Sequence, residues 1–195
     1  MFRNEIYYTC ISHRLFIFAG GRRMERAEFL EKLSDSYSAY YDLHPEAEAD
    51  GLPLAFRADY FSRSERYWLS KNIPIWGNET NEYAYIFSAP SFDVELAGKC
   101  IDFALADGLP RVKPHKEHQY TNVKVILIAD SFDEATISFV RKRKFSKSYK
   151  FSLHGFTDLK AAAVSLSERK AYPNAAAERE LTDYFRKLFT AMDKS

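Results

Sequence analysis

Hydrophobic residues recur every four positions soon after Met24, which predicts an amphipathic helix. One side of this helix would present Phe29, Leu33, Tyr37 and Tyr41. Residues 42–53 contain two prolines, a glycine and several acids, and this composition ends the helical pattern. The first regular element is therefore a helix that packs one apolar face against the rest of the protein.

Alternating polar and apolar residues replace the helical pattern after residue 53. This alternation and a high density of aromatic residues predict strands over 54–61 and 65–76. The dipeptide Gly77-Asn78 then predicts a turn, and residues 82–89 read as a third strand.

A short internal repeat follows, because residues 86–93 and 126–133 share one pattern. Each segment is an apolar strand that ends in alanine, followed by one residue and then by Ser-Phe-Asp at the start of an amphipathic run. We interpret Ser91 and Ser131 as helix N-caps, and Ser131 with Glu134 matches a capping box. The repeat predicts two strand-to-helix units.

The last part of the chain combines an ambiguous segment with a clear helix. Residues 161–166 are compatible with strand or helix, and the alternation of Val164 and Leu166 with serines favours a strand. Residues 177–192 have one apolar and one charged side, which predicts a final helix. The expected fold class is α+β, with a single mixed or mainly antiparallel sheet of about five to six strands and about four helices.

Residues 1–23 differ from the remainder of the chain. Their apolar pieces are too short for a membrane span or a signal peptide. Our preferred hypothesis is that translation starts at Met24 and that this N-terminal extension reflects a mis-called start; an ordinary N-terminal arm is the alternative. We therefore expect one globular domain over 24–192.

Composition restricts the kind of function. The chain has 195 residues, and 28 basic against 27 acidic residues give a net charge of +1. Such a balance creates no global field that attracts nucleic acid or an anionic membrane, so any anion binding must be local. The two cysteines, Cys10 and Cys100, form neither a disulfide framework nor a metal motif, which favours a cytoplasmic location. Because nucleotide-binding and common catalytic motifs are absent, we expect no cofactor.

The strongest local feature is the segment 141–150, in which six of ten residues are Lys or Arg. We expect the anion-binding residues to be Lys113, Arg141, Arg143, Lys144, Lys147 and Lys150. If a strand starts at residue 144, Lys147 falls on the apolar side and requires an acidic partner or a ligand there. Tyr149 or Phe151 could offer a stacking surface for a base. The alternative is a cationic helix end followed by an edge strand whose lysines discourage aggregation.

Three residues are candidates for catalysis: His115, Asp130 and Glu82. His115 could act as a general acid or base beside Lys113, and Asp130 follows the carboxyl end of a predicted strand. His115 and His118 are also candidate metal ligands, but no third ligand is fixed by spacing, and we expect no metal. A polar loop is the alternative for both histidines, and a capping role is the alternative for Asp130.

Segments 81–87, 112–121 and 129–156, in this order, resemble a family of uncharacterised bacterial proteins, a domain of unknown function. The resemblance covers about residues 24–189. It implies an intracellular bacterial protein, and it supplies no known activity and no catalytic residues.

We therefore expect a soluble cytoplasmic binding protein that engages a phosphate-bearing ligand or nucleic acid through 141–150, without a membrane partner. A metal-dependent phosphodiesterase or nuclease is the first alternative, since such an enzyme needs carboxylates close to a lysine-rich strand. A protein-interaction or structural module is the second. The sequence leaves the oligomeric state open.

Overall fold

A computed structural model describes residues 24–67 and 74–194, with side chains described over 24–63 and 78–194. The predictions for residues 1–23 lie outside this part of the chain.

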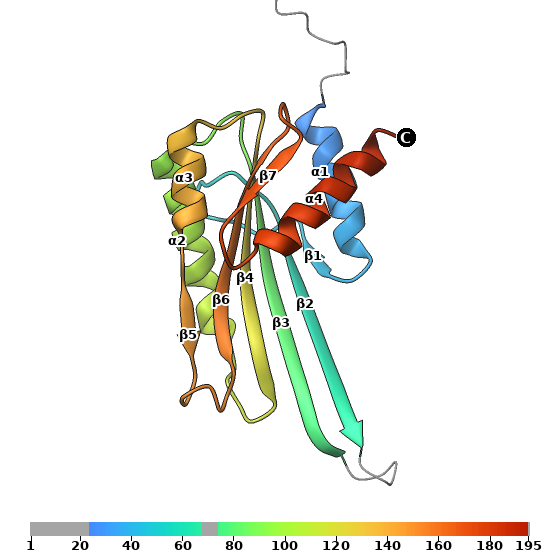
Figure 1. The fold of residues 1–195 in the computed structure, drawn as a ribbon, viewed down its shortest axis with the longest axis vertical. Helices are drawn as coiled ribbons and strands as arrows, with labels where there is room; N and C mark the ends of the chain where they lie inside the picture. Colours follow the sequence, from blue (N-terminus) through green and yellow to red (C-terminus); the bar gives the residue numbers. More distant parts are fainter. Residues whose placement is uncertain (1–23, 68–73, 195) are drawn as a thin grey trace, which may run out of the picture.

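One mixed sheet forms the middle layer of the structure (Figure 1). Its strands are β1 (Asp42–His44), β2 (Leu54–Tyr67), β3 (Pro74–Ser88), β4 (His118–Ala129), β5 (Ser146–Ser148), β6 (Phe156–Ser165) and β7 (Lys170–Pro173). The order is β1-β2-β3-β4-β6-β5, and β7 also pairs with β6. Strands β3, β4 and β6 are parallel, whereas the other pairs are antiparallel. The predicted α+β fold with a mixed sheet is confirmed, with seven strands in the described residues.

Helices cover both faces of the sheet (Figure 1). They are α1 (Arg26–Ser38), α2 (Val94–Arg111), α3 (Glu134–Lys142) and α4 (Glu178–Met192). Residues Ala84 and Ile86 of β3 join the core beneath α1 and α4, whereas Tyr85 and Phe87 join the core beneath α2 and α3. Because successive side chains of a strand point to opposite faces, β3 supplies both cores.

The two predicted strand-to-helix units are confirmed as β3-α2 and β4-α3. Their N-caps, however, are Asp93 and Asp133 rather than the two serines. The Oδ1 atom of Asp93 accepts a hydrogen bond from the Leu96 N–H at 2.7 Å, and that of Asp133 accepts one from the Thr136 N–H at 2.6 Å. A carboxylate satisfies a free N–H and also complements the positive end of the helix dipole, which favours Asp over Ser here.

The predicted turn at Gly77-Asn78 is wrong. Both residues lie inside β3, where they pair with Glu65 and Ser64 of β2. The antiparallel ladder continues past them, and its regular hydrogen bonds outweigh the local turn preference of a Gly-Asn pair. The long β2-β3 hairpin consequently extends beyond the other strands at the lower end of the molecule (Figure 1).

Candidate functional site

The basic segment lies along the edge of the sheet, from the last turn of α3 through β5 to the turn that follows (Figure 1). We use the name cationic edge for its exposed members Arg141, Lys142, Lys144, Lys147 and Lys150. No ion pair joins any of them to a residue that the structure describes. Their charges are therefore directed to solvent.

The predicted burial of Lys147 is wrong. Only residues 146–148 form a strand, and all three are exposed. Strand β5 lies below the end of α3 and has β6 as its strand partner (Figure 1). The ammonium of Lys147 lies 5.4 Å from the centroid of the Tyr149 ring, which is within the range of a cation–π contact.

Arg143 is different from its neighbours because its side chain is already engaged. Its guanidinium hydrogen-bonds to Asp102 of α2 and lies 5.5 Å from the centroid of the Phe139 ring. The buried Asn174 side chain donates from Nδ2 to the Arg143 carbonyl at 3.0 Å and to the Leu159 carbonyl at 2.9 Å. These contacts fix the chain between α3 and β5 and hold the start of the cationic edge in place.

A left-handed turn ends β5. Lys150, Phe151 and Ser152 have positive φ angles of 46°, 55° and 68°. Each non-glycine residue in this region costs roughly 1–2 kcal/mol. The turn leaves the Phe151 side chain 99% exposed and that of Leu153 75% exposed. The strand that the sequence predicts from residue 144 therefore breaks at this turn, which places the Phe151 ring in solvent one residue after Lys150.

His118 anchors this turn to β4. The buried imidazole donates from Nδ1 to the His154 carbonyl at 2.7 Å, and the Thr121 hydroxyl lies 2.9 Å from Nε2. Since a carbonyl only accepts, Nδ1 bears the proton and Nε2 accepts from the hydroxyl. Both nitrogens are engaged, which leaves no lone pair for a metal. The described residues contain no cluster of three or more His, Cys, Asp or Glu that could hold a metal ion.

His115 and Lys113 lie beside a different feature, an open cavity of about 520 Å³ on the α2 side of the sheet. Strands β2 and β3 contribute Phe61, Asn81 and Tyr83 to it, and the chain after α2 contributes Lys113 and His115. His115 contacts Glu79 through Nε2 at 2.7 Å, and its Nδ1 accepts from the Glu117 N–H at 3.2 Å. This arrangement assigns the proton to Nε2 and engages both nitrogens.

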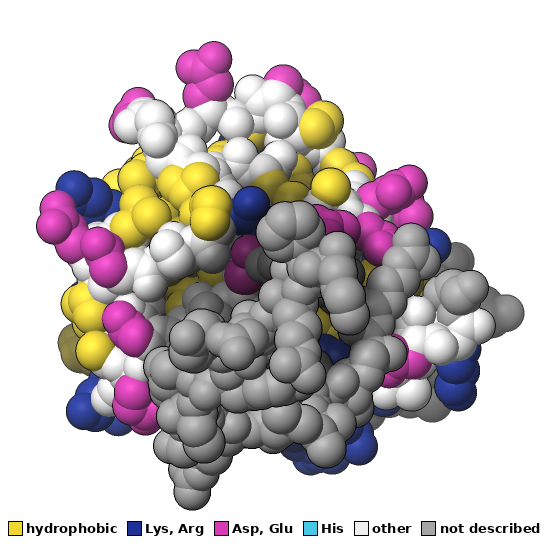
Figure 2. Space-filling model, turned by 90° about the horizontal axis from the view of Figure 1, so that it is seen from above, with side chains coloured by type: hydrophobic (Ala, Val, Ile, Leu, Met, Phe, Trp, Pro, Cys, Tyr) yellow, Lys and Arg dark blue, Asp and Glu magenta, His cyan; other side chains and the backbone are white. Residues whose placement is uncertain are grey.

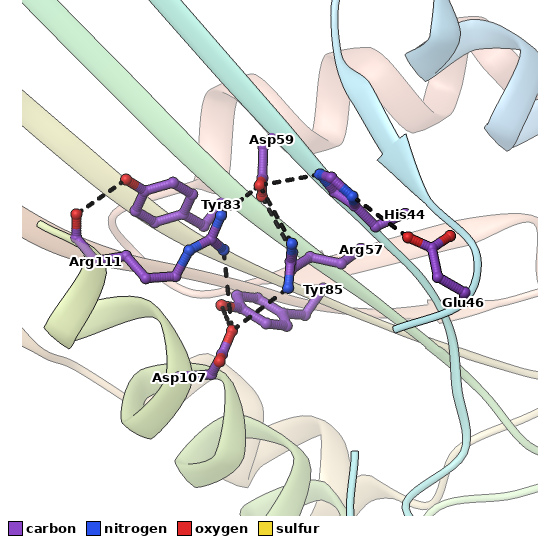
Figure 3. A network of polar contacts seen from close by, with 8 residues as sticks. All are labelled: His44, Glu46, Arg57, Asp59, Tyr83, Tyr85, Asp107 and Arg111. Carbon is purple, nitrogen blue, oxygen red and sulfur yellow. Dashed lines mark hydrogen bonds and ion pairs between the residues drawn. The ribbon is translucent and has the colours of Figure 1, made fainter. Parts of the chain in front are cut away.

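A polar network borders the cavity (Figure 3). Asp59 is its centre, since its carboxylate contacts His44 at 3.2 Å, Arg57 at 3.3 Å and also Arg111. The guanidinium of Arg111 covers the Tyr83 ring, with 4.1 Å to the centroid. These contacts, which come from β1, β2, β3 and α2, fix the C-terminus of α2 on the sheet.

Tyr85 and Asp107 complete this network (Figure 3). The Tyr85 hydroxyl donates to Asp107 Oδ2 at 2.6 Å. Burial raises the pKa of Tyr85, and the hydrogen bond to Asp107 acts in the same direction. The phenol therefore remains a donor. Neither Tyr83 nor Arg111 was predicted from the sequence. Arg111 gave no signal of a site, because a basic residue in the last turn of a helix is a common dipole complement.

The three candidate catalytic residues do not meet. Glu82 is buried on the α1 and α4 side, where it accepts from the Tyr41 hydroxyl at 2.5 Å and pairs with Lys124. Asp130 follows the carboxyl end of β4 and lies 3.6 Å from Arg26. His115 precedes the other end of that strand, which spans on the order of 40 Å. Figure 2 views the end at which β3, β4 and β6 finish, and there acidic, basic and hydrophobic side chains are interspersed among the described residues.

Fold and site together define an α+β protein with helices on both faces of a mixed sheet, a cationic edge without ion pairs to described residues and a separate polar cavity. The chain belongs to the family described as Domain of unknown function (DUF8052), whose model matches residues 25–187. No curated protein and no solved structure matches the chain. Among the helices of the described ranges, none is long and apolar enough to span a bilayer.

Proposed function

We propose that this protein binds single-stranded nucleic acid, or a smaller phosphate-bearing ligand with an unpaired base, through the cationic edge. The main observation behind this proposal is that five exposed cations lie within residues 141–150, none with an ion pair to a described residue. Phe151, which follows them in the chain, is fully exposed. Phosphate groups would provide the negatively charged partners that these cations lack among the described residues. We place this function in the cytoplasm.

The lysines and the exposed aromatic ring suit different parts of a nucleic acid, its phosphates and its bases. Lysines that neutralise phosphates release condensed counterions, which makes binding strong at low salt and independent of base sequence. An exposed aromatic ring stacks on any base, and this stacking requires a base that is not already paired. A strand of nucleic acid lying along β5 would place its backbone on the lysines and one base on Phe151.

Binding is a better supported proposal than phosphodiester cleavage. A metal-dependent nuclease would need carboxylates next to the lysines. Asp130 lies at the opposite end of β4 from the turn that His118 anchors, and Glu82 is buried beneath the helices on the other face. Neither of these two candidate carboxylates lies on the edge strand, and the described residues contain no group of three or more His, Cys, Asp or Glu that could hold a metal ion.

A direct binding measurement tests the proposal. Fluorescence anisotropy with a labelled single-stranded oligonucleotide of mixed sequence, in about 50 mM salt, should give saturable binding to the full chain. In the variant Lys144→Ala/Lys147→Ala/Lys150→Ala this binding should be weakened about tenfold or more. The matched control Lys32→Ala/Lys187→Ala/Lys194→Ala removes the same charge from exposed positions outside the edge and should retain it. Equal affinities of the two variants, or no binding by the unmodified chain, would refute the proposal.

A further inference from the structure

The cavity next to Arg111 is bounded by groups that already have partners. Glu79 accepts from Arg63 at 3.2 Å and from His115 at 2.7 Å. Arg111 is held by Asp59, and its guanidinium covers the ring of Tyr83. These paired groups give the cavity a fixed shape, which lowers the entropy that a ligand must lose on binding.

Three other groups that line the cavity have no polar partner within the described part of the chain. Lys113 is exposed and forms no ion pair there. The half-buried Asn81 makes no side-chain hydrogen bond there. Phe61 is 61% exposed, although it lies in the middle of β2 and pairs with Asn81 of β3. A cation, an amide and an aromatic surface are therefore available to a ligand.

These groups specify a chemical class. Lys113 is the one lining charge without a partner among the described residues, so a ligand with a single negative charge balances it. Phe61 favours a planar ring, because aromatic rings gain energy from offset or edge contacts. Asn81 both donates and accepts, which suits a hydroxyl on that ring. A cavity of about 520 Å³ is within the size range of small-molecule sites.

We infer that this cavity binds a small aromatic carboxylate, with its carboxylate on Lys113 and its ring on Phe61. The site is independent of the cationic edge. The cavity lies on β2 and β3, whereas β5 is three strands away from β3, which corresponds to about 14 Å. The inference therefore adds a second ligand class to the proposed function and does not rest on it.

The test is a calorimetric titration of the full chain with 4-hydroxybenzoate. We expect saturable one-to-one binding, weakened about tenfold or more in Lys113→Ala, because a charge-assisted contact is lost. Asn81→Asp keeps the size of the side chain, places a negative charge beside the ligand and should weaken binding similarly. Lys116→Ala removes an exposed lysine that does not line the cavity and should bind as the unmodified chain does.

Two further probes make the result decisive. 4-Hydroxybenzamide has the same ring and hydroxyl without the charge and should bind at least tenfold more weakly than the carboxylate. The triple lysine variant of the cationic edge should bind 4-hydroxybenzoate normally, which separates this inference from the proposed function. No saturable binding by the unmodified chain, or equal affinity of Lys113→Ala and Lys116→Ala, would overturn the inference.

Discussion

Lysines occupy two contrasting environments in this protein, and the contrast separates cations held in buried ion pairs from exposed cations that a ligand can reach. Beneath α4, the Lys124 ammonium contacts Glu82 and lies 2.9 Å from Glu180, while Lys160 pairs with Glu180. Lys124 is only 4% exposed. On the cationic edge, Lys144, Lys147 and Lys150 are exposed and have no ion pair with a described residue.

The difference between the two environments is the presence of acidic partners. A buried cation is tolerated only with partners, because desolvation costs several kcal/mol per ion. An exposed cation contributes little to stability and is free to meet a ligand. We therefore expect substitutions beneath α4 to reduce stability, and substitutions on the edge to reduce binding.

The largest effect should come from Lys124→Ala. This change leaves the buried Glu82 carboxylate without its cation and should lower the free energy of unfolding by about 3–5 kcal/mol. Urea denaturation measures it, with the exposed Lys187→Ala as a control that should stay within about 0.5 kcal/mol of the unmodified chain. A loss below about 1 kcal/mol in Lys124→Ala would mean that the buried pair has no structural role.

Gly155→Ala should have the next largest effect, because this glycine closes the left-handed turn beside the edge. It has φ +75°, and an added Cβ would lie 2.5 Å from the Gln119 carbonyl oxygen and 2.6 Å from that of His118. We expect a loss of at least about 2 kcal/mol in unfolding free energy. Gly51→Ala is the matched control, since Gly51 has φ +78° with no atom within 4 Å of the added Cβ. Equal losses in the two variants would show that the close contact is unimportant.

Phe151→Ala should weaken oligonucleotide binding without reducing stability. Stacking on one base is worth about 1–3 kcal/mol, so the dissociation constant should rise roughly 5- to 150-fold. Tyr40→Ala removes another exposed ring, 77% exposed and outside the edge, and should leave the affinity unchanged. If both variants bind equally well, Phe151 does not stack on the ligand.

The smallest expected effect is the contribution of Glu180 to the pH dependence of unfolding free energy at acid pH. Burial opposes ionisation of Glu180, but Lys124 and Lys160 outweigh it and lower its pKa. A carboxylate with a lower pKa in the folded state stabilises the protein above its unfolded pKa, and this contribution disappears as pH falls through the folded value. Between about pH 5 and 3, Glu180→Gln should therefore show a shallower decline of unfolding free energy than the unmodified chain. An unchanged pH profile would contradict the pairing.

Periodic patterns made much of the fold predictable. The amphipathic runs gave the helices, and the repeated Ser-Phe-Asp segments located two strand-to-helix units, since both signals are local in sequence. Gly77 shows the limit of such signals, because its conformation depends on pairing with Glu65 of another strand.

The candidate site was predictable only in part. The density of charge over 141–150 identified the cationic edge, but the exposure of Lys147 depends on the position of β5 at the edge of the sheet, beside β6. Lys124 lies in an apolar run, and its partner Glu180 comes from a distant helix. Phe61 and Lys113 likewise share a cavity only after the sheet and α2 have assembled.

The salt dependence of oligonucleotide affinity tests the central claim most directly. If Lys144, Lys147 and Lys150 each neutralise one phosphate, the plot of log affinity against log salt should be shallower by about 2 in the triple lysine variant than in the unmodified chain, because each contact to a single strand contributes about 0.7. Equal slopes for the two proteins, or an affinity that does not change with salt, would contradict a phosphate-binding role for the cationic edge.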